Sequence, residues 1–197
     1  KKVRLKRFYD LCTAHDVARL WAQADAWDPL DPANQEAVAE AISAASRMVE
    51  RYCGRNFIVR LHKERFTERS GTYVVRAWPI VEVKEPADAL VLDEATVKLP
   101  SRTSELHYYA GYRRADQDLA ALQLEHSDLT QLPELLPEHI RDVTAKIVVV
   151  IIRQSLSGIW GGQVEATRMG EVIVRIGRTK EIEDLLRELD YDRSLYF

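Results

Sequence analysis

The sequence has little of what would assign it to a disulfide-rich, secreted or membrane class. Cys12 and Cys53 are its only cysteines in 197 residues, too few for a disulfide framework. We expect both to be reduced, with Cys53 a small core residue at the end of a helix. The longest apolar run, residues 147–152, is far shorter than a bilayer span. No apolar stretch follows the basic start, so no signal peptide is predicted and we expect a soluble protein made in the cytoplasm.

An excess of charge of either sign is also lacking. There are 28 basic and 31 acidic residues, which gives a formal net charge of -3. A dedicated nucleic-acid-binding domain is normally clearly basic, so the composition argues against one. The composition does not exclude a local basic patch at residues 1–7 that contacts nucleic acid, with Phe8 and Tyr9 beside it as candidates for base stacking. The balanced total charge favours a solvated arm or one that contacts an acidic protein face.

Motifs for catalysis and metal binding are missing as well. No histidine is paired with a cysteine or another histidine at metal-ligand spacing. We interpret all five as surface or strand residues: His15, His62, His107, His126 and His139. Neither a phosphate loop nor a Gly-x-Ser-x-Gly elbow occurs. We therefore predict a protein that is not an enzyme and has no catalytic residues, metal or cofactor, although carboxylates that meet only in the fold stay open as an alternative.

Apolar residues at three- and four-residue spacing predict four helices. These are expected at residues 13–27, 33–53, 137–156 and 180–189. Asn34 can cap the second helix and Gly54 can end it in a left-handed conformation. Its apolar positions form one stripe: Val38, Ile42, Ala45, Val49 and Tyr52/Cys53. The third helix begins near Pro137. Its β-branched run 147–152 would also suit a buried strand, but the length of the pattern favours helix.

Between residues 55 and 114 the spacing changes to two, which predicts strands. They are expected at 57–62, 63–67, 72–75, 78–83, 89–92, 96–99 and 106–112, with a further strand at 171–176. The polar residues 115–136 suggest a short helical insert. We predict an α+β fold that is mainly helical: a helix bundle with an inserted small antiparallel β region and a C-terminal helix and arm. A single domain over 1–197 would comprise an N-terminal extension (1–35), a core (36–189, with a polar insert at 115–135) and a C-terminal arm (190–197).

Four short motifs, in order, link the chain to a known family. They are the helix end Tyr52-Cys53-Gly54-Arg55 after an alanine-rich helix, Trp78-Pro79-Ile80-Val81, Tyr108-Tyr109-Ala110-Gly111-Tyr112, and Leu136-Pro137-Glu138-His139-Ile140. This order resembles the head–tail connector (adaptor) proteins of long-tailed phages and gene transfer agents, over residues 36–157. Each motif is also explained by local structure, since Gly54 ends a helix and Gly111 permits a turn. The functional hypothesis therefore depends on the resemblance.

The resemblance implies a structural subunit of the virion neck, between head and tail. Similar proteins form a ring of about twelve copies that binds the portal protein and a tail-side stopper or terminator protein. DNA passes through the ring's channel without sequence-specific binding, and no membrane is involved. The implied portal-docking residues are Tyr191, Arg193, Leu195, Tyr196 and Phe197, and the candidate subunit-interface residues are Trp78 and Trp160. The terminal aromatic residues would equally suit packing on their own domain. A stopper or tail-completion protein is the alternative, followed by a DNA-binding module.

Overall fold

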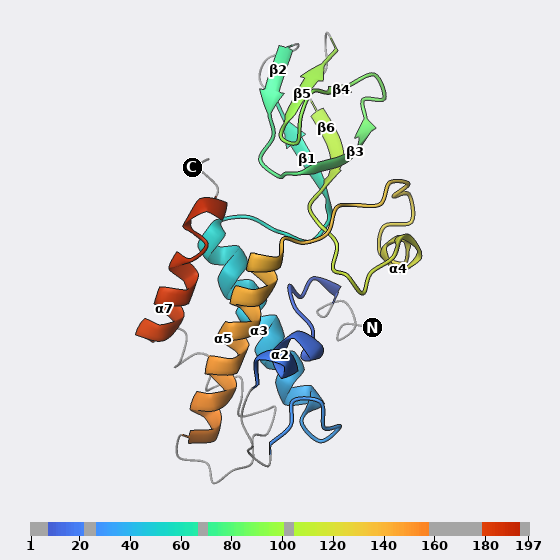
Figure 1. Ribbon diagram of the computed structural model, residues 1–197. Coiled ribbons are helices and arrows are strands. Elements are labelled where there is room, and N and C mark those ends of the chain that lie inside the picture. Colours follow the sequence, from blue (N-terminus) through green and yellow to red (C-terminus); the bar gives the residue numbers. More distant parts are fainter. Residues whose placement is uncertain (1–7, 22–26, 67–70, 101–104, 158–178, 194–197) are drawn as a thin grey trace. The chain divides into compact units, whose positions relative to one another are not determined.

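The computed structural model describes residues 8–21, 27–66, 71–100, 105–157 and 179–193 (Figure 1). The chain divides into two compact units. The helical unit comprises Lys1–Arg55 and Pro137–Leu195, and the β unit contains Asn56–Leu136. The predicted core, 36–189, is thus shared between the two units.

The helical unit contains α2 (Ala14–Leu20), α3 (Gln35–Cys53), α5 (Glu138–Ser157), α7 (Lys180–Arg187) and the 3-10 turn η1 (Asp190–Asp192). Helix α2 begins with a capping box, in which Thr13 and Asp16 satisfy each other's backbone N–H groups. Helix α3 ends at Gly54, whose φ of 68° confirms the predicted left-handed C-cap. Asn34 does not cap α3 with its side chain as predicted: its backbone is in the αR region and not in the extended region typical of a capping residue, and its amide donates to the Asp28 carbonyl at 2.8 Å.

Helix α3 is buried over more of its circumference than the single predicted stripe. Residues 41–46 are buried without interruption, and all are small apart from Ile42. Small side chains let neighbouring elements approach α3 closely, and both α2 and α5 contact it. On one side, Ser46 Oγ accepts the Leu11 N–H at 2.9 Å and Ser43 Oγ donates to Asp10 Oδ1 at 2.9 Å. These two serines fix the segment before α2 against α3.

The β-branched run at residues 147–152 folds as part of helix α5. Residues 147–152 are helical and buried, and α5 contacts α2, α3 and α7. Tertiary packing thus outweighs the weak helix propensity of valine and isoleucine. The buried hydroxyls of Thr144 and Ser155 donate to the carbonyls four residues earlier, at 2.7 Å each. The predicted strand at 171–176 lies outside the described residues.

The β unit consists of two three-stranded antiparallel sheets and one short helix. One sheet has the order β1-β6-β3 and the other β2-β5-β4. Their bounds are β1 (Arg60–Arg65), β2 (Gly71–Val74), β3 (Ile80–Glu85), β4 (Leu90–Val91), β5 (Thr96–Leu99) and β6 (Glu105–Ala110), and the helix is α4 (Leu119–Gln123). The two strands predicted at 57–62 and 63–67 are a single strand, β1. A hydrophobic core of this unit is made by Val75, Val97, Leu99, Leu106, Tyr108 and Ala110.

The predicted fold class needs a correction. The described chain is α+β, with five α-helices and two small antiparallel sheets. The expectation of a mainly helical protein is wrong, because the strands are as prominent as the helices. The physical reason is that residues 56–136 bury a core of their own, so they form a compact unit instead of a small insert in a bundle.

Candidate functional site

The C-terminal turn around Tyr191 presents an aromatic side chain on a fixed support. Helix α7 follows Thr179, and acidic Glu181 and Glu183 in its first turn face the positive end of the helix dipole. Ile182 and Leu189 are fully buried and attach α7 and the turn after it to the helical unit. The chain then enters η1, Asp190–Asp192, one turn beyond α7. The predicted helix over 180–189 therefore ends slightly early, and its last turn tightens.

Two aspartates hold η1 to two different helices. Asp190 Oδ1 accepts the Tyr52 hydroxyl of α3 at 2.6 Å, and Asp192 Oδ2 lies 2.8 Å from His139 Nε2 of α5. The hydrogen bond to the Asp190 carboxylate raises the pKa of Tyr52, because it favours the protonated phenol. Arg193 lies over the Tyr52 ring, 5.1 Å from its centroid. The turn is therefore held on both sides of residue 191.

Between these anchors, the Tyr191 side chain is fully exposed, at 101% of its reference area. A large aromatic side chain on a fixed backbone loses little conformational entropy on binding, so it suits an interface anchor. Of the predicted docking residues, Tyr191 and Arg193 lie together and are both exposed. Leu195, Tyr196 and Phe197 lie outside the described residues. No local sequence pattern indicated that Tyr52 and His139 would position this turn, since they come from distant helices.

Trp78 lies at a fixed turn of the β unit. It precedes a cis peptide bond to Pro79, and its side chain is half-buried. The Pro79 carbonyl accepts the Gly111 N–H at 2.9 Å. Gly111 has a φ of 121°, and a Cβ there would lie 2.8 Å from the Phe57 carbonyl oxygen. The glycine is therefore required for this close approach. The other predicted interface residue, Trp160, lies outside the described residues.

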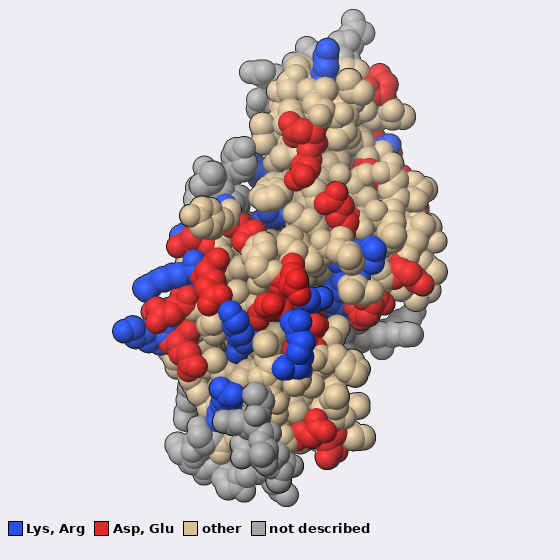
Figure 2. Space-filling view, in the orientation of Figure 1, with Lys and Arg blue, Asp and Glu red and all other residues tan. Residues whose placement is uncertain are grey.

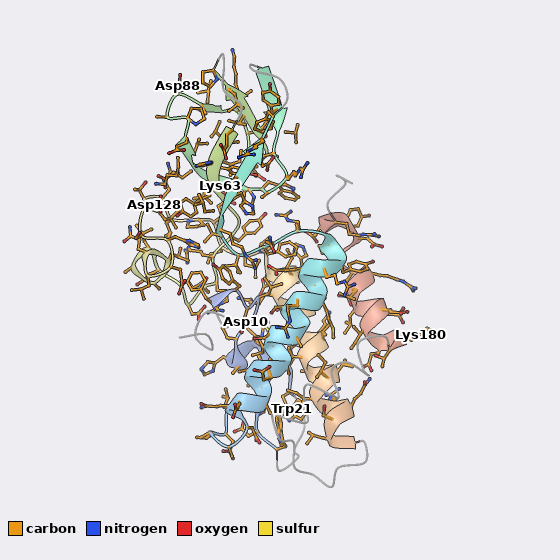
Figure 3. The ribbon with its side chains drawn as sticks, turned by 180° about the vertical axis from the view of Figure 1, so that it is seen from behind. Asp10, Trp21, Lys63, Asp88, Asp128 and Lys180 are labelled. Carbon is orange, nitrogen blue, oxygen red and sulfur yellow. The ribbon has the colours of Figure 1, made fainter. Side chains whose placement is uncertain are left out.

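The polar insert at 115–135 is tied to the sheet β1-β6-β3. It contains the predicted short helix, α4, and buries Leu122 and Leu129 completely. Glu82 of β3 accepts hydrogen bonds from the Thr130 N–H and hydroxyl, at 2.9 Å each. Lys84 donates to both Glu82 and the Asp128 carbonyl, and the Tyr109 hydroxyl donates to the Asp128 carboxylate. Figure 3 labels Asp128 beside this sheet. These hydrogen bonds therefore attach the insert to the sheet of the β unit.

The same contacts set the ionisation of the acidic side chains. Burial alone would raise the pKa of Glu82, but hydrogen bonds from Lys84 and Thr130 hold that pKa below its ordinary value. The hydrogen bond from Tyr109 lowers the pKa of Asp128. Burial lowers the pKa values of His62 and His126, which favours their neutral forms. These shifts follow from burial and from contacts that hold the β unit together.

Two further sequence predictions can be located. Both cysteines are buried and unbridged, and burial raises the pKa of Cys53 to about 12. Among the described residues, no group of three His, Cys, Asp or Glu side chains is placed to hold a metal ion. None of the helices in the described ranges has the length and apolar character needed to cross a bilayer.

A groove of about 420 Å³ lies within the helical unit between α5 and α7. Apolar and charged residues both line it: Leu20, Lys146, Val149, Val150, Arg153, Glu181, Asp184, Leu185 and Glu188. Lys146 and Glu188 pair across it at 3.0 Å. Figure 2 shows acidic and basic side chains interspersed over this unit. The groove therefore offers no field of a single sign to a charged ligand.

Comparison with known proteins adds no support to the resemblance, which depends on the four sequence motifs alone. No protein-family model matches the chain, and no curated protein matches it either.

Proposed function

We propose that the chain is a head–tail connector (adaptor) subunit of a tailed phage or phage-like particle, which acts by assembly and not by catalysis. Copies form a ring of about twelve that joins the portal to the tail-side stopper or terminator protein and surrounds the DNA channel. The protein then belongs in the virion neck. The order of the four motifs between residues 52 and 140 supports this proposal.

One structural observation carries the docking part of the proposal. Tyr191 is fully exposed while the residues on either side of it are tied to α3 and α5. The exposed Tyr191 side chain adds nothing to the protein's own core. The arrangement suits a C-terminal surface that anchors a partner, with exposed Arg193 beside it. We assign the portal to that surface.

The test is direct binding to purified portal. We expect the chain to bind, the Tyr191→Ala variant to bind at least about tenfold more weakly, and deletion of 190–197 to abolish binding. Interface aromatic anchors often contribute about 2 kcal/mol or more, and 2 kcal/mol corresponds to a change in affinity of about thirtyfold. Leu124→Ala, at a leucine that is 79% exposed in the β unit, is the matched control. Normal binding by the truncated chain would contradict the docking role.

Two alternatives give different results in the same assays. A stopper or tail-completion protein would bind the tail side of the neck and leave isolated portal unbound. A DNA-binding module would show salt-dependent DNA binding that is lost when residues 1–9 are deleted. Electron microscopy of an assembled particle would show which position in the neck the protein occupies.

A further inference from the structure

The sheet formed by β2, β5 and β4 (Figure 1) has one buried face and one exposed face. Val97 and Leu99 of β5 are buried in the hydrophobic core of the β unit. Side chains alternate along a strand, so Thr96 and Lys98 lie on the opposite face, which we call the outer face. The outer face of an antiparallel sheet is normally polar, so its apolar content is informative here.

Three aliphatic side chains are exposed on the outer face. The register arranges its residues in two rows across the strands: the first row is Val74, Thr96 and Leu92, and the second is Thr72, Lys98 and Leu90. The exposed fractions of Leu90, Leu92 and Val74 are 58%, 49% and 49%. Three exposed aliphatic side chains on so small a face indicate a contact surface.

Two charged residues lie on either side of the first row. Lys98 belongs to the second row, and Glu94 lies in the turn that joins β4 to β5, beyond the first row. Each is two residues from Thr96, and both are exposed. Neither has an ion-pair partner among the described residues. The other acid of the turn, Asp93, accepts the Ala95 N–H at 2.8 Å, which fixes the turn at the end of the two strands.

We propose that the outer face packs on the outer face of a second copy, about a twofold axis that runs across the strands at Thr96. The axis reverses the strand direction, so that Val74 and Leu92 meet their own counterparts. Lys98 of each copy then lies over Glu94 of the other. Packed sheets are about 10 Å apart, a distance that a lysine and a glutamate side chain can bridge together.

The charges select a second copy as the occupant of this face. Because the base and the acid lie at equal distances along the chain from Thr96, the face is complementary to itself once it is turned over. Such a contact is isologous, which means that both copies use the same patch. It closes at two copies, so it is distinct from the heterologous contacts of the proposed ring.

The size of the face predicts a weak dimer. Three strands about 4.8 Å apart, each about four residues long at about 3.4 Å per residue, cover roughly 14 Å by 14 Å. This footprint is far smaller than the surface of about 800 Å² that each partner buries in a standard interface. Standard interfaces bind with micromolar or tighter affinity, so we expect a dissociation constant above about 1 µM for the free chain.

The first experiment is sedimentation velocity of the full chain at concentrations up to about 1 mM, well above the expected dissociation constant. The natural chain should dimerise. Lys98→Glu and Glu94→Lys should each weaken dimerisation at least about tenfold, because each places like charges at both ends of the contact. Lys63→Glu makes the same charge change at an exposed lysine of β1 and should leave dimerisation unchanged. Circular dichroism of each variant checks that it is folded.

The second experiment mixes the two single variants. A Lys98→Glu copy and a Glu94→Lys copy place opposite charges at both ends of a twofold contact. The two should therefore associate with each other at least as tightly as the natural chain does with itself, although neither associates with its own kind. The double variant Lys98→Glu/Glu94→Lys should regain dimerisation, because it exchanges the two charges and keeps their match.

Three outcomes would overturn the proposal. A natural chain that stays monomeric up to about 1 mM would leave the outer face to a different partner. Dimerisation that is lost on deleting residues 1–7 but is insensitive to the variants at 94 and 98 would assign it to another surface. Single variants that fail to associate when mixed would contradict the twofold register. No portal is present in either assay, so these results are independent of whether the connector binds a portal.

Discussion

In the helical unit, buried hydroxyl groups are satisfied largely within their own helix, whereas in the β unit polar groups are satisfied across long stretches of sequence. Ser46, Thr144 and Ser155 each donate to the carbonyl four residues earlier. Glu82 and Thr130, by contrast, are 48 residues apart, and the hydroxyl of Tyr108 reaches Glu64 over 44 residues. The difference shows that a hydroxyl inside a helix finds its acceptor locally, whereas the strands of the β unit bring together polar groups that are far apart in the sequence.

The largest effect should come from a cavity in the helical unit. Ile151 of α5 is fully buried, so Ile151→Ala should lower the free energy of unfolding by about 2–5 kcal/mol. Urea denaturation measures the loss, and hydrogen exchange locates it. Leu132→Ala, at a leucine that is 50% exposed, should cost far less. Equal costs for the two variants would mean that α5 is not a core element.

The stability of the β unit should fall most when a side chain is added at Gly111, where the backbone leaves no room for one. In Gly111→Ala, the new Cβ would meet the Phe57 carbonyl and the Val59 N–H, each at 2.8 Å, at a φ of 121°. We expect a loss of about 2–3 kcal/mol, because strained φ values cost about 1–3 kcal/mol before any clash is relieved. Hydrogen exchange should quicken in β1, β3 and β6. Faster exchange confined to α3 and α5 would contradict the assignment of Gly111 to the β unit.

The dependence on ionised groups can be tested through pH. Glu82→Gln removes the charge that binds Lys84 and Thr130, so the variant should be less stable than the natural chain by about 1 kcal/mol at pH 7. The folded pKa of Glu82 lies below its unfolded value, so its contribution is present above about pH 4 and is lost as the pH falls through the folded pKa. The two stability curves should therefore converge in acid. A constant difference down to pH 2 would mean that the charge is not what stabilises the insert.

The smallest effect is expected at the C-terminal turn. Tyr52→Phe removes the hydrogen bond to Asp190 from an exposed site, so global stability should fall by at most about 1 kcal/mol. Exchange of the amides in 190–193 should nevertheless quicken, and portal binding should weaken without any change at Tyr191 itself. Tyr73→Phe, a tyrosine of the β unit, is the matched control. Unchanged exchange in 190–193 would show that Asp190 does not hold the turn.

Local patterns predicted the elements more reliably than their assembly. Gly54 and the apolar spacing located the end of α3 and the helix α5, because both signals are local. The extent of burial of α3 was not predictable, since the alanine and serine residues at 41–46 indicate neither burial nor exposure by themselves. They are buried because α2 and α5 pack against α3. The share of the fold that is made of strands was underestimated, because the pairing of β1 with β6 joins residues about 45 positions apart. Likewise, nothing near Tyr191 in the sequence pointed to Tyr52 and His139 as its supports.

The division of the sequence between the two units also orders their synthesis. The helical unit needs α3, which precedes residue 56, and α5, which follows residue 136, whereas the β unit is encoded between them. At about 5–20 residues per second, a ribosome needs roughly 4–16 s to translate the intervening stretch. The face of α3 that packs on α5 therefore has no partner while the β unit is being translated, and the β unit can fold before α5 leaves the ribosome.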